Sequence, residues 1–136
     1  MPGLYVLVIR LAESYEMTVG SLGPVAFPCG TYLYVGSARG PGGLRARVDR
    51  HRRQHGKRMH WHIDVLLQHA RVEKVFWTTD EEKDECTLAA RLDQHGERFP
   101  TGFGASDCRC GGHLIHWTDS RPVALGRVLS GMNRTS

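Results

Sequence analysis

Residues 30–51 read Gly-Thr-Tyr-Leu-Tyr-Val-Gly-Ser-Ala-Arg-Gly-Pro-Gly-Gly-Leu-Arg-Ala-Arg-Val-Asp-Arg-His, and this stretch decides the fold. Residues 31–35 are β-branched, aromatic or apolar, which predicts a buried strand that ends at Gly36 and Ser37. A glycine-rich turn at 39–43 follows, and apolar residues then recur at helical spacing among arginines. The predicted strand, loop and helix bring tyrosine hydroxyls together with guanidinium groups, which match phosphate geometry.

The charge of the chain is unevenly distributed. The 136 residues favour a single domain spanning 1–136, and 18 Lys and Arg against 14 Asp and Glu give a net charge of +4. Basic residues concentrate between Arg39 and Arg58, where Asp49 is the only acid. Such a block favours a polyanionic partner, and a solvated helix face is the alternative.

The sequence predicts a cytoplasmic protein without a membrane partner. No stretch approaches the ~20 apolar residues that span a bilayer. The apolar run at residues 4–9 has no basic segment before it and no cleavage site after it. The cysteines are therefore expected to be reduced thiols or metal ligands rather than disulfides, namely Cys29, Cys86, Cys108 and Cys110.

Hydrophobic patterning predicts an α/β (α+β) fold. Strands are expected at 3–11, 31–35, 72–78 and 113–117, and a hairpin at 17–27 that extends the edge of the sheet. Helices are expected at 43–55, as a short segment ending near His69, and at 123–129. A further long helix is expected to end at about 96, with Thr79 or Asp80 as the cap at its start. The centre should be a small, mainly antiparallel sheet of the strands around Tyr5, Tyr34 and Val75, flanked by helices.

Two short motifs carry a family resemblance. Gly3-Leu4-Tyr5 lies in the first predicted strand and Tyr34-Val35-Gly36 in the next long one. Together they resemble the signature of the GIY-YIG nuclease superfamily, which implies a GIY-YIG-like fold. That superfamily also has an Arg in the helix after the second motif and a Glu on a later helix. Arg47 and Glu85 match these positions.

The resemblance extends over nearly the whole chain and is closest to a DUF123-type branch of the superfamily. The segments that carry it are His60-Trp61-His62-Ile63-Asp64, Glu85-Cys86-x-Leu88-Ala89 and Phe103-Gly104-x-Ser106-Asp107-Cys108-x-Cys110. Two features depart from the pattern. The spacer between the two motifs is longer and holds the extra hairpin. The Asn that often follows the Glu has no equivalent, because the only Asn is Asn133; Asp107 or Ser106 would take its place.

The resemblance implies a metal-dependent endonuclease that hydrolyses phosphodiester bonds in DNA, or RNA, with structure rather than sequence selectivity. Glu85 would hold one Mg²⁺ or Mn²⁺ ion, and Arg47 would bind the scissile phosphate. Tyr5 and Tyr34 would contact the phosphate or the attacking water, with Tyr5 as general base. His51, one turn after Arg47, would accept a proton.

Further basic residues are expected to bind the nucleic acid: Arg39, Arg45, Arg50, Arg52, His60 and His62. The two histidines flank Trp61 and would share a face in a strand or loop. A structural pair bonded to a carboxylate such as Asp64 is the alternative.

Other interpretations of these residues stay open. The tyrosines could be core aromatics, and Glu85 a surface carboxylate on the first turn of a helix. The missing Asn motivates a second hypothesis, a nucleic-acid-binding module without catalysis. The third is a zinc-stabilised interaction protein using Cys108, Cys110 and His113, followed by His116. Since Cys-x-Cys is closer than the usual structural zinc spacing, buried thiols in a tight loop are expected instead.

Overall fold

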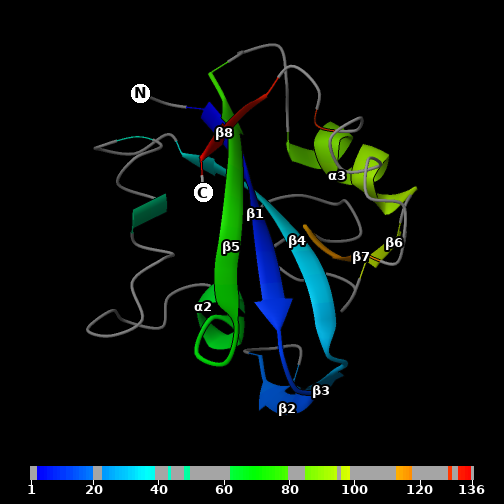
Figure 1. Ribbon diagram of the computed structural model, residues 1–136. Helices are drawn as coiled ribbons and strands as arrows, with labels where there is room; N and C mark the ends of the chain where they lie inside the picture. The colour runs from blue at the N-terminus through cyan, green and yellow to red at the C-terminus, as the bar shows by residue number, and fades with distance from the viewer. Residues whose placement is uncertain are drawn as a thin grey trace.

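The computed structural model describes residues 3–19, 23–38, 43, 48–49, 62–79, 85–94, 96–98, 113–117, 129 and 132–135. Its elements are shown in Figure 1. They are β1 (Gly3–Leu11), β2 (Tyr15–Thr18), β3 (Pro24–Phe27), β4 (Gly30–Ala38), α2 (His62–Leu66), β5 (Arg71–Thr78), α3 (Glu85–Asp93), β6 (Gly96–Arg98), β7 (Leu114–Trp117) and β8 (Asn133–Thr135).

An antiparallel sheet of order β6-β7-β4-β1-β5-β8 forms the centre of the fold. β1 pairs along its length with β4 on one side and with β5 on the other. Residues 4–9 are all buried, because both faces of β1 are covered. The predicted small α+β fold with a mainly antiparallel sheet is therefore confirmed.

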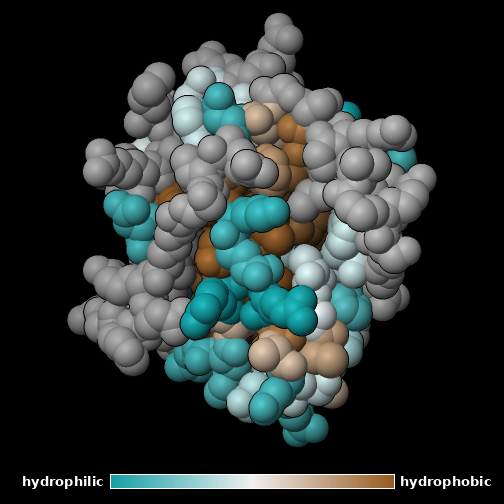
Figure 2. All heavy atoms as spheres, viewed as in Figure 1, coloured by the Kyte–Doolittle hydropathy of each residue, from teal (hydrophilic) through white to brown (hydrophobic). Residues whose placement is uncertain are grey.

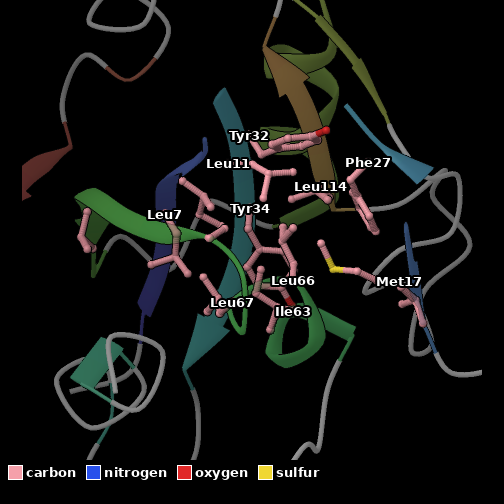
Figure 3. Close-up of a cluster of buried hydrophobic side chains, with 14 of the residues drawn as sticks. Leu7, Leu11, Met17, Phe27, Tyr32, Tyr34, Ile63, Leu66, Leu67 and Leu114 are labelled. Carbon is pink, nitrogen blue, oxygen red and sulfur yellow. The ribbon is translucent and has the colours of Figure 1, made fainter. Parts of the chain in front are cut away.

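The two faces of the sheet bury separate apolar clusters. One face, here called the tyrosine face, carries Tyr5, Leu7, Ile9, Tyr32 and Tyr34. Ile63 and Leu66 of α2, and Leu67 in the turn after it, pack on this face, as Figure 3 shows. The opposite face carries Leu4, Val6, Val8, Leu33 and Val35, and α3 covers it with Leu88, Ala89 and Leu92.

The register of β1 and β4 places Tyr5 opposite Gly36. A Cβ atom at Gly36 would lie only 2.4 Å from Cζ and Oη of Tyr5, so the phenol ring occupies the space that a side chain would need. The strand continues through Gly36 to Ala38. The prediction that Gly36 and Ser37 end this strand was wrong, because the glycine accommodates a neighbouring ring and does not break the strand.

The hairpin between the two motif strands was predicted correctly, but its position was not. β2 and β3 pair as a two-stranded sheet of their own. Met17, Val19 and Phe27 bury their side chains in the cluster on the tyrosine face. The hairpin does not extend the central sheet, whose edge strands are β6 and β8, because its apolar residues are buried against the tyrosine face.

Several other predicted elements are confirmed with shifted ends. α2, followed by a turn to His69, and the strands β5 and β7 lie where expected. α3 ends at Asp93, before the predicted end near 96, and residues 80–84, at its predicted start, lie outside the described residues. The short strands β6 and β8 were not predicted. Most of the predicted helices at 43–55 and 123–129 lies outside the described residues. No helix in the described ranges is long and apolar enough to cross a bilayer.

Replacing Gly36 with Ala should destabilise the fold by about 1–3 kcal/mol, because the new methyl group overlaps the Tyr5 ring. In Gly36→Ala/Tyr5→Leu the loss should be smaller than the sum of the single losses by about 1 kcal/mol, because the shorter side chain vacates that space. Urea denaturation of the four proteins measures this coupling.

Leu92→Ala is the control, because Leu92 packs on the opposite face of the sheet. Its destabilisation should simply add to that of Gly36→Ala. If the destabilisation caused by Tyr5→Leu also simply added to that of Gly36→Ala, the ring and the glycine would not be in contact.

Candidate functional site

Tyr5 and Tyr34, the tyrosines of the two motifs, lie on the same face of the sheet. Tyr5 is opposite Gly36, two residues beyond Tyr34, so the two tyrosines are diagonal neighbours on adjacent strands. Both are largely buried, with exposed fractions of 1% for Tyr5 and 8% for Tyr34. Figure 3 shows Tyr34 close to Ile63 and Leu66 of α2. The structure thus brings the two predicted phenols together beneath a covered surface.

The arginine-rich segment reaches the same face where it is described. Val48 and Asp49 are helical, and the half-buried Val48 packs against the cluster on the tyrosine face, while Asp49 is exposed. The predicted residues around them lie outside the described residues: Arg39, Arg45, Arg47, Arg50, His51, Arg52 and His60.

Glu85 belongs to an element that packs on the other face. It is the first residue of α3, whose Leu88, Ala89 and Leu92 bury against the face opposite the tyrosines. The position of its carboxylate lies outside the described residues. The packing of α3 alone therefore does not bring Glu85 onto the tyrosine face.

The two described histidines near the C-terminus, His113 and His116, contact residues of the central sheet. His116 stacks on Tyr32 with ring centroids 4.7 Å apart and planes at 19°. Its Nε2 lies 3.0 Å from the place where a Cβ of Gly30 would be. His113 is buried and its carbonyl accepts a hydrogen bond from the backbone N–H of Val35. Cys108 and Cys110 lie outside the described residues. Of the predicted zinc ligands, the structure therefore describes only His113 and His116.

A buried carboxylate was missed as a candidate. Asp64 in α2 is fully buried, has an interaction partner, and belongs to a helix that packs on the tyrosine face. The signal in the sequence is an acid inside the apolar run at 63–67. The preceding His62 begins α2, and His60, with which it was expected to share a face, lies outside the described residues. Within the described ranges, no three His, Cys, Asp or Glu side chains converge in a way that would hold a metal ion.

Over residues 4–133 the sequence matches the family described as "Domain of unknown function DUF123". Because the match includes almost all of the chain, the protein belongs to the DUF123 family. No curated protein and no solved structure shows significant similarity to it.

The burial of the tyrosines predicts an order of chemical modification. Tetranitromethane should nitrate Tyr15, which is 39% exposed, first. Tyr34 should follow slowly, and Tyr5 and Tyr32 should stay unmodified in the folded protein, because their exposed fractions are 1% and 0%. Peptide mass spectrometry measures the order, with Tyr15→Phe as the control. Nitration of Tyr5 as fast as Tyr15 would mean that the tyrosine face is open to solvent.

Proposed function

We propose that this member of the DUF123 family is a metal-dependent endonuclease that hydrolyses phosphodiester bonds in nucleic acid, DNA ahead of RNA. One observation carries the proposal: Tyr5 and Tyr34, from motifs far apart in the sequence, lie together on one face of the sheet. Val48 of the arginine-rich segment packs against the same face. This arrangement agrees with the resemblance to the GIY-YIG superfamily.

In this proposal the hydroxyl groups of Tyr5 and Tyr34 would contact the reacting phosphate, and their low exposure requires the side chains that cover them to move aside when the nucleic acid binds. Tyr5 and Tyr34 offer hydroxyl groups that donate or accept hydrogen bonds with a phosphate oxygen or a water molecule. Arg47 precedes Val48 and would oppose the charge that develops on the phosphate in the transition state. His51 would accept a proton, since an unperturbed imidazole titrates near neutral pH.

Glu85 would supply the metal-binding carboxylate. Mg²⁺ or Mn²⁺ is held through one or two protein carboxylates and keeps several waters, so a cluster of ligands is not required. The ion would stabilise charge on the phosphate and lower the pKa of a bound water. Glu85 begins α3, and Figure 1 shows this end of the helix toward the end of the sheet where β1 starts. Tyr5 is the third residue of β1, so the carboxylate would have to reach the phosphate around that end of the sheet.

The expected substrate is defined by shape. Contacts from arginines and phenols to phosphates fix the position of a nucleic acid but read no base edges. The enzyme would therefore prefer branched, flapped or single-stranded substrates over a long recognition sequence.

Glu85→Gln should lower Mg²⁺- or Mn²⁺-dependent nicking by about 100-fold or more, because the amide removes the charged metal ligand. The assay uses supercoiled plasmid together with flap, junction and single-stranded oligonucleotides. Glu16→Gln is the matched control, because Glu16 is exposed on β2 and should leave the rate unchanged. Cleavage at the wild-type rate by purified Glu85→Gln would refute the assignment.

A nucleic-acid-binding module without catalysis is the second candidate. It is favoured by the burial of Tyr5 and by the packing of α3 on the opposite face of the sheet. It predicts binding that weakens with salt through Arg45, Arg47, Arg50 and Arg52, and no cleavage with any metal. Each Arg→Gln substitution should reduce the slope of log affinity against log salt by about 1. Metal-dependent cleavage that Glu85→Gln abolishes would exclude this candidate.

A further inference from the structure

Two arginines face each other across neighbouring strands. A register shift between Val8 and Ile9 brings Arg10 of β1 directly opposite Arg71 of β5. Both are exposed. Like charges in this position destabilise a pair of strands. Among the described residues, neither guanidinium has an ion pair or side-chain hydrogen bond to offset the repulsion. An anion between them would remove the repulsion.

The two arginines line a pocket of about 430 Å³, here called the Arg10–Arg71 pocket. Its size is within the range of small-ligand sites. It lies where β1 ends and where the turn after α2 leads into β5, and its other lining residues are Ala12, Gln68, His69, Ala70 and Glu73. Figure 2 shows strongly hydrophilic side chains gathered over this end of β1 and β5. Gln68 and His69 add neutral groups that can donate hydrogen bonds to an anion, and Glu73 adds a carboxylate.

An aromatic surface adjoins the pocket. Tyr15 stacks on His69 with ring centroids 4.4 Å apart and planes at 26°. Among the large hydrophobic side chains that the structure describes, Tyr15 is the exposed one. A phosphate site beside an accessible aromatic ring suits a nucleotide unit, whose base can stack while its phosphate meets the guanidinium groups.

The pocket is separate from the tyrosine face. Arg10 is five residues beyond Tyr5 on β1, about 17 Å at the usual rise per residue in a strand. An odd spacing along a strand also points the two side chains toward opposite faces of the sheet. One phosphate therefore cannot contact both sites.

We propose that the Arg10–Arg71 pocket binds the phosphate of a nucleotide unit whose base stacks on Tyr15. The unit could belong to a strand of nucleic acid or be a free mononucleotide, since both present the same chemistry. This site does not depend on hydrolysis at the tyrosine face.

The test is a titration of the full ¹⁵N-labelled chain with inorganic phosphate, dTMP and the tetranucleotide dT4, following the backbone amides of Arg10, His69 and Arg71. Arg10→Gln and Arg71→Gln should each weaken binding of the nucleotide ligands by about tenfold, because each removes a charged hydrogen bond to phosphate. Arg91→Gln is the control; Arg91 is exposed on α3, and its loss should change affinity by less than about twofold.

Two further variants separate binding from misfolding and phosphate from base. Glu73→Gln should raise the affinity of all three ligands several-fold, because it removes the negative charge from the pocket. Tyr15→Leu should weaken the binding of dTMP and dT4 by about tenfold and leave the affinity for inorganic phosphate unchanged. If dT4 binds much more tightly than dTMP, the ligand is a strand of nucleic acid. If the two bind with equal affinity, the ligand is a free mononucleotide.

The proposal is overturned if no ligand shifts these amides, or if Arg10→Gln and Arg71→Gln bind the ligands as Arg91→Gln does. If the wild-type protein shows these amide shifts but does not nick plasmid, the result would count against the proposed hydrolytic function alone.

Discussion

The contact between the Tyr5 ring and the bare backbone of Gly36 determines how the two motifs relate. A Cβ at position 36 would lie 2.4 Å from the phenol, so only glycine leaves room for the ring. The contact fixes the register in which β1 pairs with β4, because a one-residue slip would turn Tyr5 to the other face. The same register makes Tyr34 the diagonal neighbour of Tyr5. A tyrosine in one strand and a glycine in the other therefore form a single structural unit.

The division of the sheet into two covered faces decides which groups can meet. The tyrosine face receives α2, the β2–β3 hairpin and Val48, whereas the opposite face receives α3. Packing thus brings the phenols and Val48 of the arginine-rich segment to the same face. The carboxylate of Glu85 would join them only from the end of the sheet. The Arg10–Arg71 pocket lies at the other end of β1, where Ile9 and Leu11 stay buried on the tyrosine face but Arg10, beyond Val8, is exposed on the opposite face.

Local signals predicted most of the elements, and contacts between distant residues explain the errors. The apolar run of β1 and the turn residues of the hairpin were sufficient because strands and tight turns depend on nearby residues. Gly36 was misinterpreted because its role comes from Tyr5, far away in sequence. β6 and β8 are three residues long and have no apolar pattern to detect. The pairing of Arg10 with Arg71 depends on a bulge, and the burial of Asp64 depends on how α2 packs; neither can be predicted from spacing.

The most direct test of the central claim is a crystal structure of the chain with Mn²⁺ and a non-hydrolysable phosphodiester. An endonuclease site predicts an anomalous manganese peak on the carboxylate of Glu85, with a phosphate oxygen within hydrogen-bonding reach of Tyr5 and Tyr34. A phosphodiester held elsewhere, with the Glu85 carboxylate directed away from the phenols on the opposite face of the sheet, would contradict the claim.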